Sequence, residues 1–297
     1  MYESYWGLKE KPFENTPDPK FIYYSQQHKE ALARMLYVVS EHKGAGLLTG
    51  EYGSGKTLLS RVLWQELQQQ ENRYQAVFIL NPRLSGKEFI QEIVHQLGGD
   101  ESEEKIDLFH CLHKILYANH NSGRHSVIMI DEAQAVEDMG IFEELRLLLN
   151  FQLDDAFLLT IILLGQPELR RIITTLPQLN QRMSVRYHLR ALDETEVKEY
   201  IHHRLTVAGA AKDIFEEDAV KEIYFSSLGI PRCINNICDL SLLVGFASGL
   251  KSINKDTIIK VSEDMEASGN DILPLKSSPQ KSQASPSEAN NSKDAAV

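Results

Sequence analysis

Residues 50–57 have the types and the spacing of a loop that binds phosphate. They match the pattern G-x-x-x-x-G-K-[ST], in which glycines let backbone N–H groups turn inward around phosphate oxygens. Lys56 would add a compact positive charge for the β- and γ-phosphates of a nucleotide, and the Thr57 hydroxyl would bind Mg²⁺. The alternative is a glycine-rich turn without function. The predicted nucleotide-binding residues are Gly50, Glu51, Tyr52, Gly53, Ser54, Gly55, Lys56, Thr57 and Leu58.

The segments around this loop predict the strand, loop and helix in which such a loop works. Residues 45–49 form a short apolar run that is typical of a strand. Residues 58–67 have the apolar spacing of a helix, whose positive dipole end would face the phosphates. This context favours the phosphate-binding interpretation over a plain turn.

A pair of carboxylates follows the continuous apolar run at residues 127–130. Asp131, at the end of this predicted strand, could bind Mg²⁺ directly or through water. Glu132 could activate the attacking water as a general base. Many strands end in acids without any function, but this pair follows the phosphate loop in the order found in ATPases. The order favours the catalytic interpretation.

Four more polar residues are candidates for contact with the γ-phosphate. Gln166 follows an apolar strand and could sense the phosphate and orient water, or could be a loop residue before a proline. Arg182 and Arg186 precede or lie in the last strand and could act in the site of a neighbouring subunit. A surface position or a salt bridge is the alternative for both. Arg232 opens a helix and could couple nucleotide state to domain angle.

The pattern of elements predicts a two-sided α/β sheet followed by helices. Five apolar runs predict strands that alternate with helices, which indicates a parallel sheet. From residue 193 onward no strand is expected, and Asp193 with Glu196 has the pattern of a capping box at a helix start. The strands are expected at residues 45–49, 75–80, 127–130, 158–164 and 185–189. The later helices are expected at residues 193–205, 216–226, 233–248 and 254–266.

These elements predict four regions along the chain. Residues 1–35 are rich in aromatic residues and proline and are expected to pack on the core. Residues 36–192 form the expected nucleotide-binding domain, and residues 193–267 a small all-α lid. Residues 268–297 hold few large apolar side chains, so we expect this tail to be disordered.

Composition limits the classes of function. The formal net charge of −11 opposes nonspecific binding to a phosphate backbone, although a local basic patch is compatible with it. The three cysteines have no metal-ligand pattern, and neither do His110, His113 and His120. Residues 1–6 do not resemble a signal peptide, and the apolar run 157–164 is too short to span a bilayer. A cytoplasmic protein with free thiols is expected.

The order of these motifs resembles an AAA+ ATPase, and more closely an ATPase similar to general secretion pathway protein A. The resemblance extends over about residues 1–266. It implies an AAA+ P-loop core with strand order 5-1-4-3-2 and a helical lid, with ATP and Mg²⁺ held between them near the N-terminal segment. It also implies that oligomerisation on ATP binding completes the site. The resembling stretches are residues 5–13, 16–19, 28–32, 145–150, 164–169, 181–182, 186–189 and 229–235.

In that family the ATPase supports assembly of an envelope system such as secretion, pilus or exopolysaccharide and sorting machinery. Related proteins often continue into a membrane span and a peptidoglycan-binding domain, whereas this chain ends in a polar tail. Recruitment to the inner membrane would then need a protein partner. Two alternatives stay open. One is an ATP-dependent DNA-binding regulator of transposition that uses Arg170, Arg171, Arg182, Arg186 and Arg190, and the other is a switch that scarcely hydrolyses nucleotide.

Overall fold

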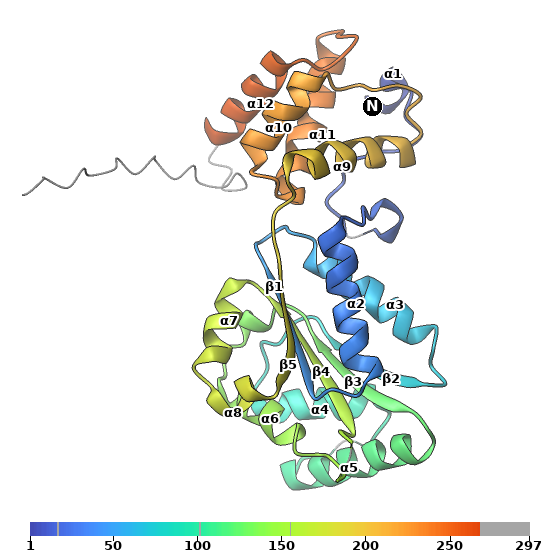
Figure 1. Cartoon of the computed structure of the whole chain (residues 1–297), viewed down its shortest axis with the longest axis vertical. Coiled ribbons are helices and arrows are strands. Elements are labelled where there is room, and N and C mark those ends of the chain that lie inside the picture. Colours follow the sequence, from blue (N-terminus) through green and yellow to red (C-terminus); the bar gives the residue numbers. More distant parts are fainter. Residues whose placement is uncertain (17, 101, 155, 268–297) are drawn as a thin grey trace, which may run out of the picture.

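The computed structural model describes residues 1–16, 18–100, 102–154 and 156–267 (Figure 1). It has an α/β part, which holds a five-stranded sheet, and a helical part above the sheet in the view of Figure 1. We call the helices of residues 193–267 the lid. The disorder expected for residues 268–297 lies outside the described residues.

The sheet is wholly parallel, with strand order β2-β3-β4-β1-β5. Read from the other edge, this is the expected order 5-1-4-3-2, which is therefore confirmed. Every residue of β1, β3 and β4 is buried, because helices cover both faces of the sheet. The strands are β1 (Ala45–Gly50), β2 (Tyr74–Ile79), β3 (His125–Ile130), β4 (Leu159–Gly165) and β5 (Met183–Leu189).

Alternating strand residues divide the core of the α/β part into two layers. Leu47 of β1 packs in a cluster with residues of the later helices, whereas its neighbour Leu48 packs with residues of the first two long helices. The first layer is formed by α4 (Gly86–Gln96), α5 (Lys105–Asn121), α6 (Gly140–Leu148), α7 (Pro167–Thr174) and α8 (Pro177–Gln181). The second is formed by α2 (Gln26–Ser40) and α3 (Lys56–Gln68).

The lid contains four helices, and the described part of the chain has no strand there. The capping box expected at its start is present, because Asp193 accepts a hydrogen bond from the Glu196 backbone and Glu196 accepts one from the Asp193 backbone. The helices are α9 (Glu194–Val207), α10 (Glu217–Ser227), α11 (Pro231–Ala247) and α12 (Lys255–Ala267).

The N-terminal segment differs from the expectation that residues 1–35 pack on the core. The buried aromatic residues between the start of α1 (Glu3–Trp6) and the end of the short helix η1 (Pro19–Phe21) belong to the apolar cluster of the lid, together with Tyr2. The Trp6 indole donates a hydrogen bond to the Leu242 carbonyl of α11 at 2.9 Å. These rings cover apolar surface that four short helices would leave in water. The last part of the segment, within α2, packs on the sheet, and η1 also contacts α3 of the α/β part.

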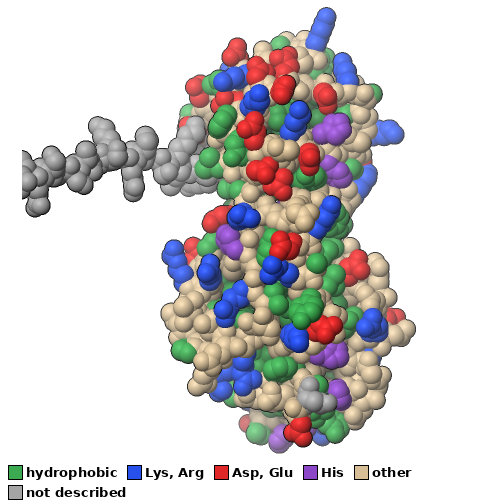
Figure 2. Space-filling model, viewed as in Figure 1, with side chains coloured by type: hydrophobic (Ala, Val, Ile, Leu, Met, Phe, Trp, Pro, Cys, Tyr) green, Lys and Arg blue, Asp and Glu red, His purple; other side chains and the backbone are tan. Residues whose placement is uncertain are grey.

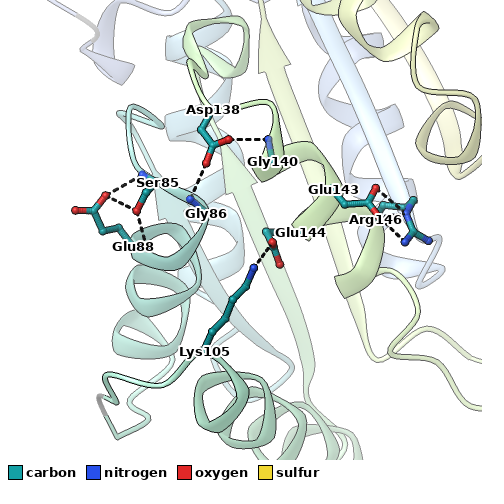
Figure 3. A network of polar contacts seen from close by, with 9 residues as sticks. All are labelled: Ser85, Gly86, Glu88, Lys105, Asp138, Gly140, Glu143, Glu144 and Arg146. Atoms are coloured by element: carbon teal, nitrogen blue, oxygen red, sulfur yellow. Dashed lines mark hydrogen bonds and ion pairs between the residues drawn. The ribbon is translucent and has the colours of Figure 1, made fainter.

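Polar contacts join the helices of the first layer (Figure 3). The Asp138 carboxylate accepts hydrogen bonds from the backbone of Gly86 at 3.0 Å and of Gly140 at 2.8 Å. One side chain thus satisfies free N–H groups at the starts of both α4 and α6. Lys105 of α5 pairs with the buried Glu144 of α6. These contacts join α4 and α5 to α6 and to the segment before it, within the first layer.

We predict that Trp6→Ala loosens the lid more than the sheet. The side chain is only 6% exposed, so its removal should cost about 3 kcal/mol in the local unfolding of the lid. Hydrogen exchange measured by mass spectrometry should become faster in α9 and α11 and stay unchanged in β1, β3 and β4. Tyr37→Ala, at an exposed aromatic of α2, is the matched control. Equal acceleration across the sheet would contradict packing of this segment on the lid.

Candidate nucleotide site

Three chain segments that carry predicted site residues leave the sheet at the same edge. Thr49 of β1 is paired with Gly165 of β4, and Ile130 of β3 is paired with Leu163 of β4. The phosphate loop, the carboxylates that follow β3 and the glutamine that follows β4 therefore start side by side. Parallel α/β sheets bind ligands at this edge of the sheet. The register thus brings together the residues that the sequence indicated separately.

The backbone of the phosphate loop requires glycine. Gly53 and Gly55 have φ angles of 78° and 98°, in the region that side chains disfavour. A Cβ atom on Gly50 would lie 2.8 Å from the Leu189 carbonyl, and one on Gly53 would lie 2.6 Å from Arg232 Cβ. The buried Ser54 hydroxyl has no hydrogen-bond partner among the described residues. A phosphate group fits this loop, since it would supply the missing partner and accept from N–H groups.

Lys56 is a buried cation at the first residue of α3. Its side chain is 4% exposed, and its ammonium donates hydrogen bonds to the carbonyls of Gly50 at 2.8 Å and Glu51 at 2.9 Å. Burial lowers the pKa of Lys56, while the charges of Glu132 and Asp131 act in the opposite direction. A polyphosphate in the loop would give this ammonium the strong anionic partner that two neutral carbonyls do not provide.

Asp131 lies directly behind the loop. It is 1% exposed and accepts hydrogen bonds from the Ser60 hydroxyl at 3.2 Å and from the Glu132 backbone at 2.9 Å. Burial raises the pKa of Asp131, whereas hydrogen bonds that include one from Thr57 act against the rise. Carboxylate and hydroxyl oxygens are ligands that Mg²⁺ prefers, so Thr57 and Asp131 fit the expected metal. Sequence analysis did not include Ser60.

Glu132 is held by two glutamines. Its Oε2 accepts a hydrogen bond from Gln134 Nε2 at 2.5 Å and one from Gln166 Nε2 at 3.4 Å. Gln134 also accepts the backbone N–H of Gln166 at 2.9 Å. The structure therefore brings Gln166 to the predicted base. Sequence analysis missed Gln134, although its spacing of two residues from Glu132 placed it near the same strand end.

A cavity of about 260 Å³ lies between the phosphate loop and the lid. Arg232 lines it, with its guanidinium carbon 4.8 Å from the centre of the Tyr52 ring and its backbone N–H bonded to the Gly53 carbonyl. Glu132 reaches the same cavity. Larger hollows of about 530 and 660 Å³, between α9 and α10 and beside His42, contain none of the predicted site residues. The nucleotide residues in contact with the cavity are Tyr52, Gly53, Gly55, Lys56, Thr57 and Leu58.

The lid wall of this cavity contains polar residues that sequence analysis missed. Arg204 of α9 is buried and donates to the Tyr200 hydroxyl at 2.7 Å and to Asn235 at 3.3 Å. It also donates to the carbonyls of Pro12 at 2.6 Å and Glu14 at 3.0 Å. The lid and the N-terminal segment therefore form one wall. No local motif predicts these residues, because the partners of Arg204 other than Tyr200 lie far away in the sequence.

Two predicted arginines do not reach this cavity. Arg182 precedes β5, and the first residue of β5 is paired with Ala45 at the opposite end of β1 from the phosphate loop. At about 3.3 Å per residue, this end of the sheet lies roughly 17 Å away. Arg182 donates to Leu149 and Asn150, and Arg186 to Asn180. Neither arginine therefore contacts the cavity of its own chain.

Comparisons with known proteins agree with this arrangement. The model of the AAA domain family matches residues 39–173. General secretion pathway protein A of Aeromonas hydrophila is 41% identical over 257 residues, which are 85% of this chain and 46% of that protein. The chain thus spans about half the length of this curated relative.

Solved structures share the fold. The ORC2 protein of Aeropyrum pernix is 16% identical, with a TM-score of 0.63 over 86% of this chain and 72% of that one. The RuvB branch migration motor of Thermotoga maritima is 19% identical, with a TM-score of 0.55 over 82% and 70% of the two chains.

The AAA domain match includes the phosphate loop, Asp131, Glu132 and Gln166. Within the described ranges, no helix has both the length and the apolar character needed to cross a membrane. One family assignment follows from the strand order, the glycine-lined loop and the sequence identity over most of the chain. The chain is an AAA domain protein related to general secretion pathway protein A.

Proposed function

We propose that this protein binds ATP with Mg²⁺ and hydrolyses it to ADP and phosphate. The observation that carries the proposal is the convergence of a buried cation, a buried carboxylate and a partly exposed carboxylate at one edge of the sheet. These are Lys56, Asp131 and Glu132. Phosphoryl transfer to water requires a cation that binds the phosphates, oxygen ligands that bind a metal ion and a base that accepts a proton from water.

Each residue has a separate role in this proposal. The loop N–H groups and Lys56 hold the phosphates, and Thr57 with Asp131 holds Mg²⁺, which would neutralise charge on the phosphate oxygens. Glu132 accepts the proton of the attacking water. Gln166 orients that water, and the contact of Gln166 and Gln134 with Glu132 supports this role. Arg232 lines the cavity from the side of the lid, and its contact with the nucleotide would couple the nucleotide state to the position of the lid.

The chain organisation that follows is a nucleotide-binding domain and a lid. We propose boundaries near residues 36–192 and 193–267, with ATP held between the two. Residues 1–21 then act with the lid, since Arg204 joins the N-terminal segment to α9. ATP binding would favour a homo-oligomer in which Arg182 of one subunit serves the site of the next. The position of Arg182 far from its own cavity supports a role in a neighbouring subunit.

We also propose that ATP turnover drives assembly of a bacterial envelope system through protein contacts. The identity with general secretion pathway protein A over 85% of the chain supports this role. The client would be a secretion, pilus or exopolysaccharide and sorting machine. The protein would work in the cytoplasm or at the inner membrane, where a partner would recruit it.

DNA binding in transposition is the second candidate function. Four arginines are exposed on or near α7 and β5, and Figure 2 shows basic side chains over this side of the molecule. Steep loss of DNA binding between 50 and 200 mM salt would support contact with phosphates. The net charge of −11 favours the protein-assembly function instead. The exposed arginines are Arg170, Arg171, Arg186 and Arg190.

Lys56→Ala should weaken binding of Mg-ADP about 100-fold, because a charge-assisted contact to the phosphates is lost. Isothermal titration with the purified chain measures the dissociation constant. Lys198→Ala, at an exposed lysine of the lid, is the control and should bind as the wild type does. Unchanged affinity in Lys56→Ala would refute the phosphate-loop assignment.

Glu132→Gln should reduce ATP turnover by about 10²- to 10⁴-fold, because the amide cannot accept the proton of water. Affinity for Mg-ATP should change little. Release of phosphate under single-turnover conditions measures the chemical step. Turnover equal to that of the wild type would instead support a nucleotide switch in which Glu132 has no catalytic part.

Arg182→Ala should keep nucleotide affinity and lose turnover, by as much as about 10³-fold if it acts as an arginine finger. Mixing this variant with Glu132→Gln should partly restore turnover, because some mixed interfaces combine an intact Arg182 with an intact Glu132. Arg186→Ala is the matched variant on β5. Mixed oligomers that form without any recovery would contradict donation between subunits.

A further inference from the structure

The first turn of α2 buries two polar side chains that the proposed function leaves without a role. Gln27 is 9% exposed and His28 is 6% exposed, whereas the other buried residues of this helix are apolar. Buried polar groups are costly unless they form hydrogen bonds. Here each side chain bonds to the backbone of a different segment outside the helix. One segment is the phosphate loop, and the other is the linker to the lid.

His28 holds the phosphate loop from outside the cavity. Its Nε2 lies 3.3 Å from the Ser54 carbonyl, and its Nδ1 lies 2.7 Å from the hydroxyl of Ser25, the residue that caps α2. A carbonyl only accepts hydrogen bonds, so Nε2 carries the hydrogen and Nδ1 accepts from Ser25. Burial lowers the pKa of His28, which agrees with a neutral ring.

The same ring lies against a glycine of the loop. A Cβ atom on Gly55 would lie 3.1 Å from His28 Nε2, and Gly55 has a φ angle of 98°. Gly55 is also the residue before Lys56, where α3 begins. His28 therefore contacts the Ser54 carbonyl and also occupies the space beside Gly55. Because the Ser54 carbonyl is directed toward His28 of α2, its oxygen does not face a phosphate in the loop and does not repel it.

Gln27 holds the linker between β5 and α9. Its Oε1 accepts the backbone N–H of Arg190 at 2.8 Å, and its Nε2 donates to the Ala191 carbonyl at 3.3 Å. These two residues follow the last residue of β5 and precede the capping box of α9. A side chain that satisfies both the donor and the acceptor of adjacent residues fixes the direction in which the chain leaves the sheet.

We propose that Gln27 and His28 form a positioning pair that couples the phosphate loop to the lid. Neither side chain lines the cavity, so neither is a catalytic residue. Both belong to one turn of a helix that is packed on the sheet, so displacement of one partner segment strains the bond to the other. Nucleotide affinity then depends on Gln27 as well as on His28. This inference rests on the proposed nucleotide function.

The first experiment compares His28→Phe with His28→Gln. Phe fills the space without a donor and should raise both the dissociation constant of Mg-ADP and the KM for ATP about 10-fold. The kcat at saturating ATP should change by less than about threefold, because Glu132 is untouched. Gln can place an amide donor near the position of Nε2 and should restore affinity to within about threefold of the wild type. Lys29→Ala, at an exposed residue of the same turn, is the control.

The second experiment tests the coupling itself. Gln27→Leu should speed hydrogen exchange of the Arg190 amide and weaken Mg-ADP binding about threefold or more, although residue 27 does not touch the loop. The double variant with His28→Phe should show an effect on affinity that differs from the product of the two single effects. Effects that simply multiply would overturn the coupling.

The outcomes separate this inference from the function on which it rests. Wild-type protein that does not bind Mg-ADP would overturn the proposed function and the inference together. Wild-type binding with equal affinity in His28→Phe would overturn the inference alone. If the Phe variant does not fold, His28→Asn takes its place, since its shorter amide does not reach Ser54. Unchanged affinity in folded His28→Asn would then overturn the inference.

Discussion

Parallel pairing of β4 with both β1 and β3 is the constraint on which the site depends. The register places Thr49, Ile130 and Gly165 at the same edge, so that the segments following them converge. The pairing needs strands that are buried on both faces, and the apolar runs of β1, β3 and β4 provide them. A shift of one residue in any strand would turn its buried side chains to the other layer and separate the groups that the site requires.

Desolvation acts on both charges at the base of this site. Burial lowers the pKa of Lys56 and raises the pKa of Asp131, so each group is pushed toward its neutral form. In the proposed reaction, polyphosphate and Mg²⁺ would supply opposite charges at these two positions. The ligands of the proposed reaction would thus stabilise the site, as expected of a preorganised electrostatic environment that favours charged substrates. The hydroxyl groups of Thr57, Ser54 and Ser60 are the further polar groups of this site.

Four side chains connect the site to the rest of the chain. Arg232 reaches it from the lid, and Arg204 joins the lid to the N-terminal segment. Gln27 and His28 join α2 to the linker and to the phosphate loop. Arg204, Gln27 and His28 are buried and hydrogen-bonded, so movement of the lid would alter bonds at the cavity wall, at the linker and at the phosphate loop. The helical part is therefore mechanically linked to the nucleotide cavity.

The sequence by itself determined the phosphate loop, the carboxylates after β3, the strand order expected from the resemblance and the helical character of the lid. Apart from the strand order, which came from the family resemblance, these features follow from local patterns of glycine, charge and apolar period. Only the tertiary structure decided that the N-terminal aromatic residues pack on the lid, that Gln134 holds Glu132 and that His28 touches the loop. Arg204 and Pro12 are 192 residues apart. Contacts at such separations depend on how packed layers meet, and no local pattern encodes them.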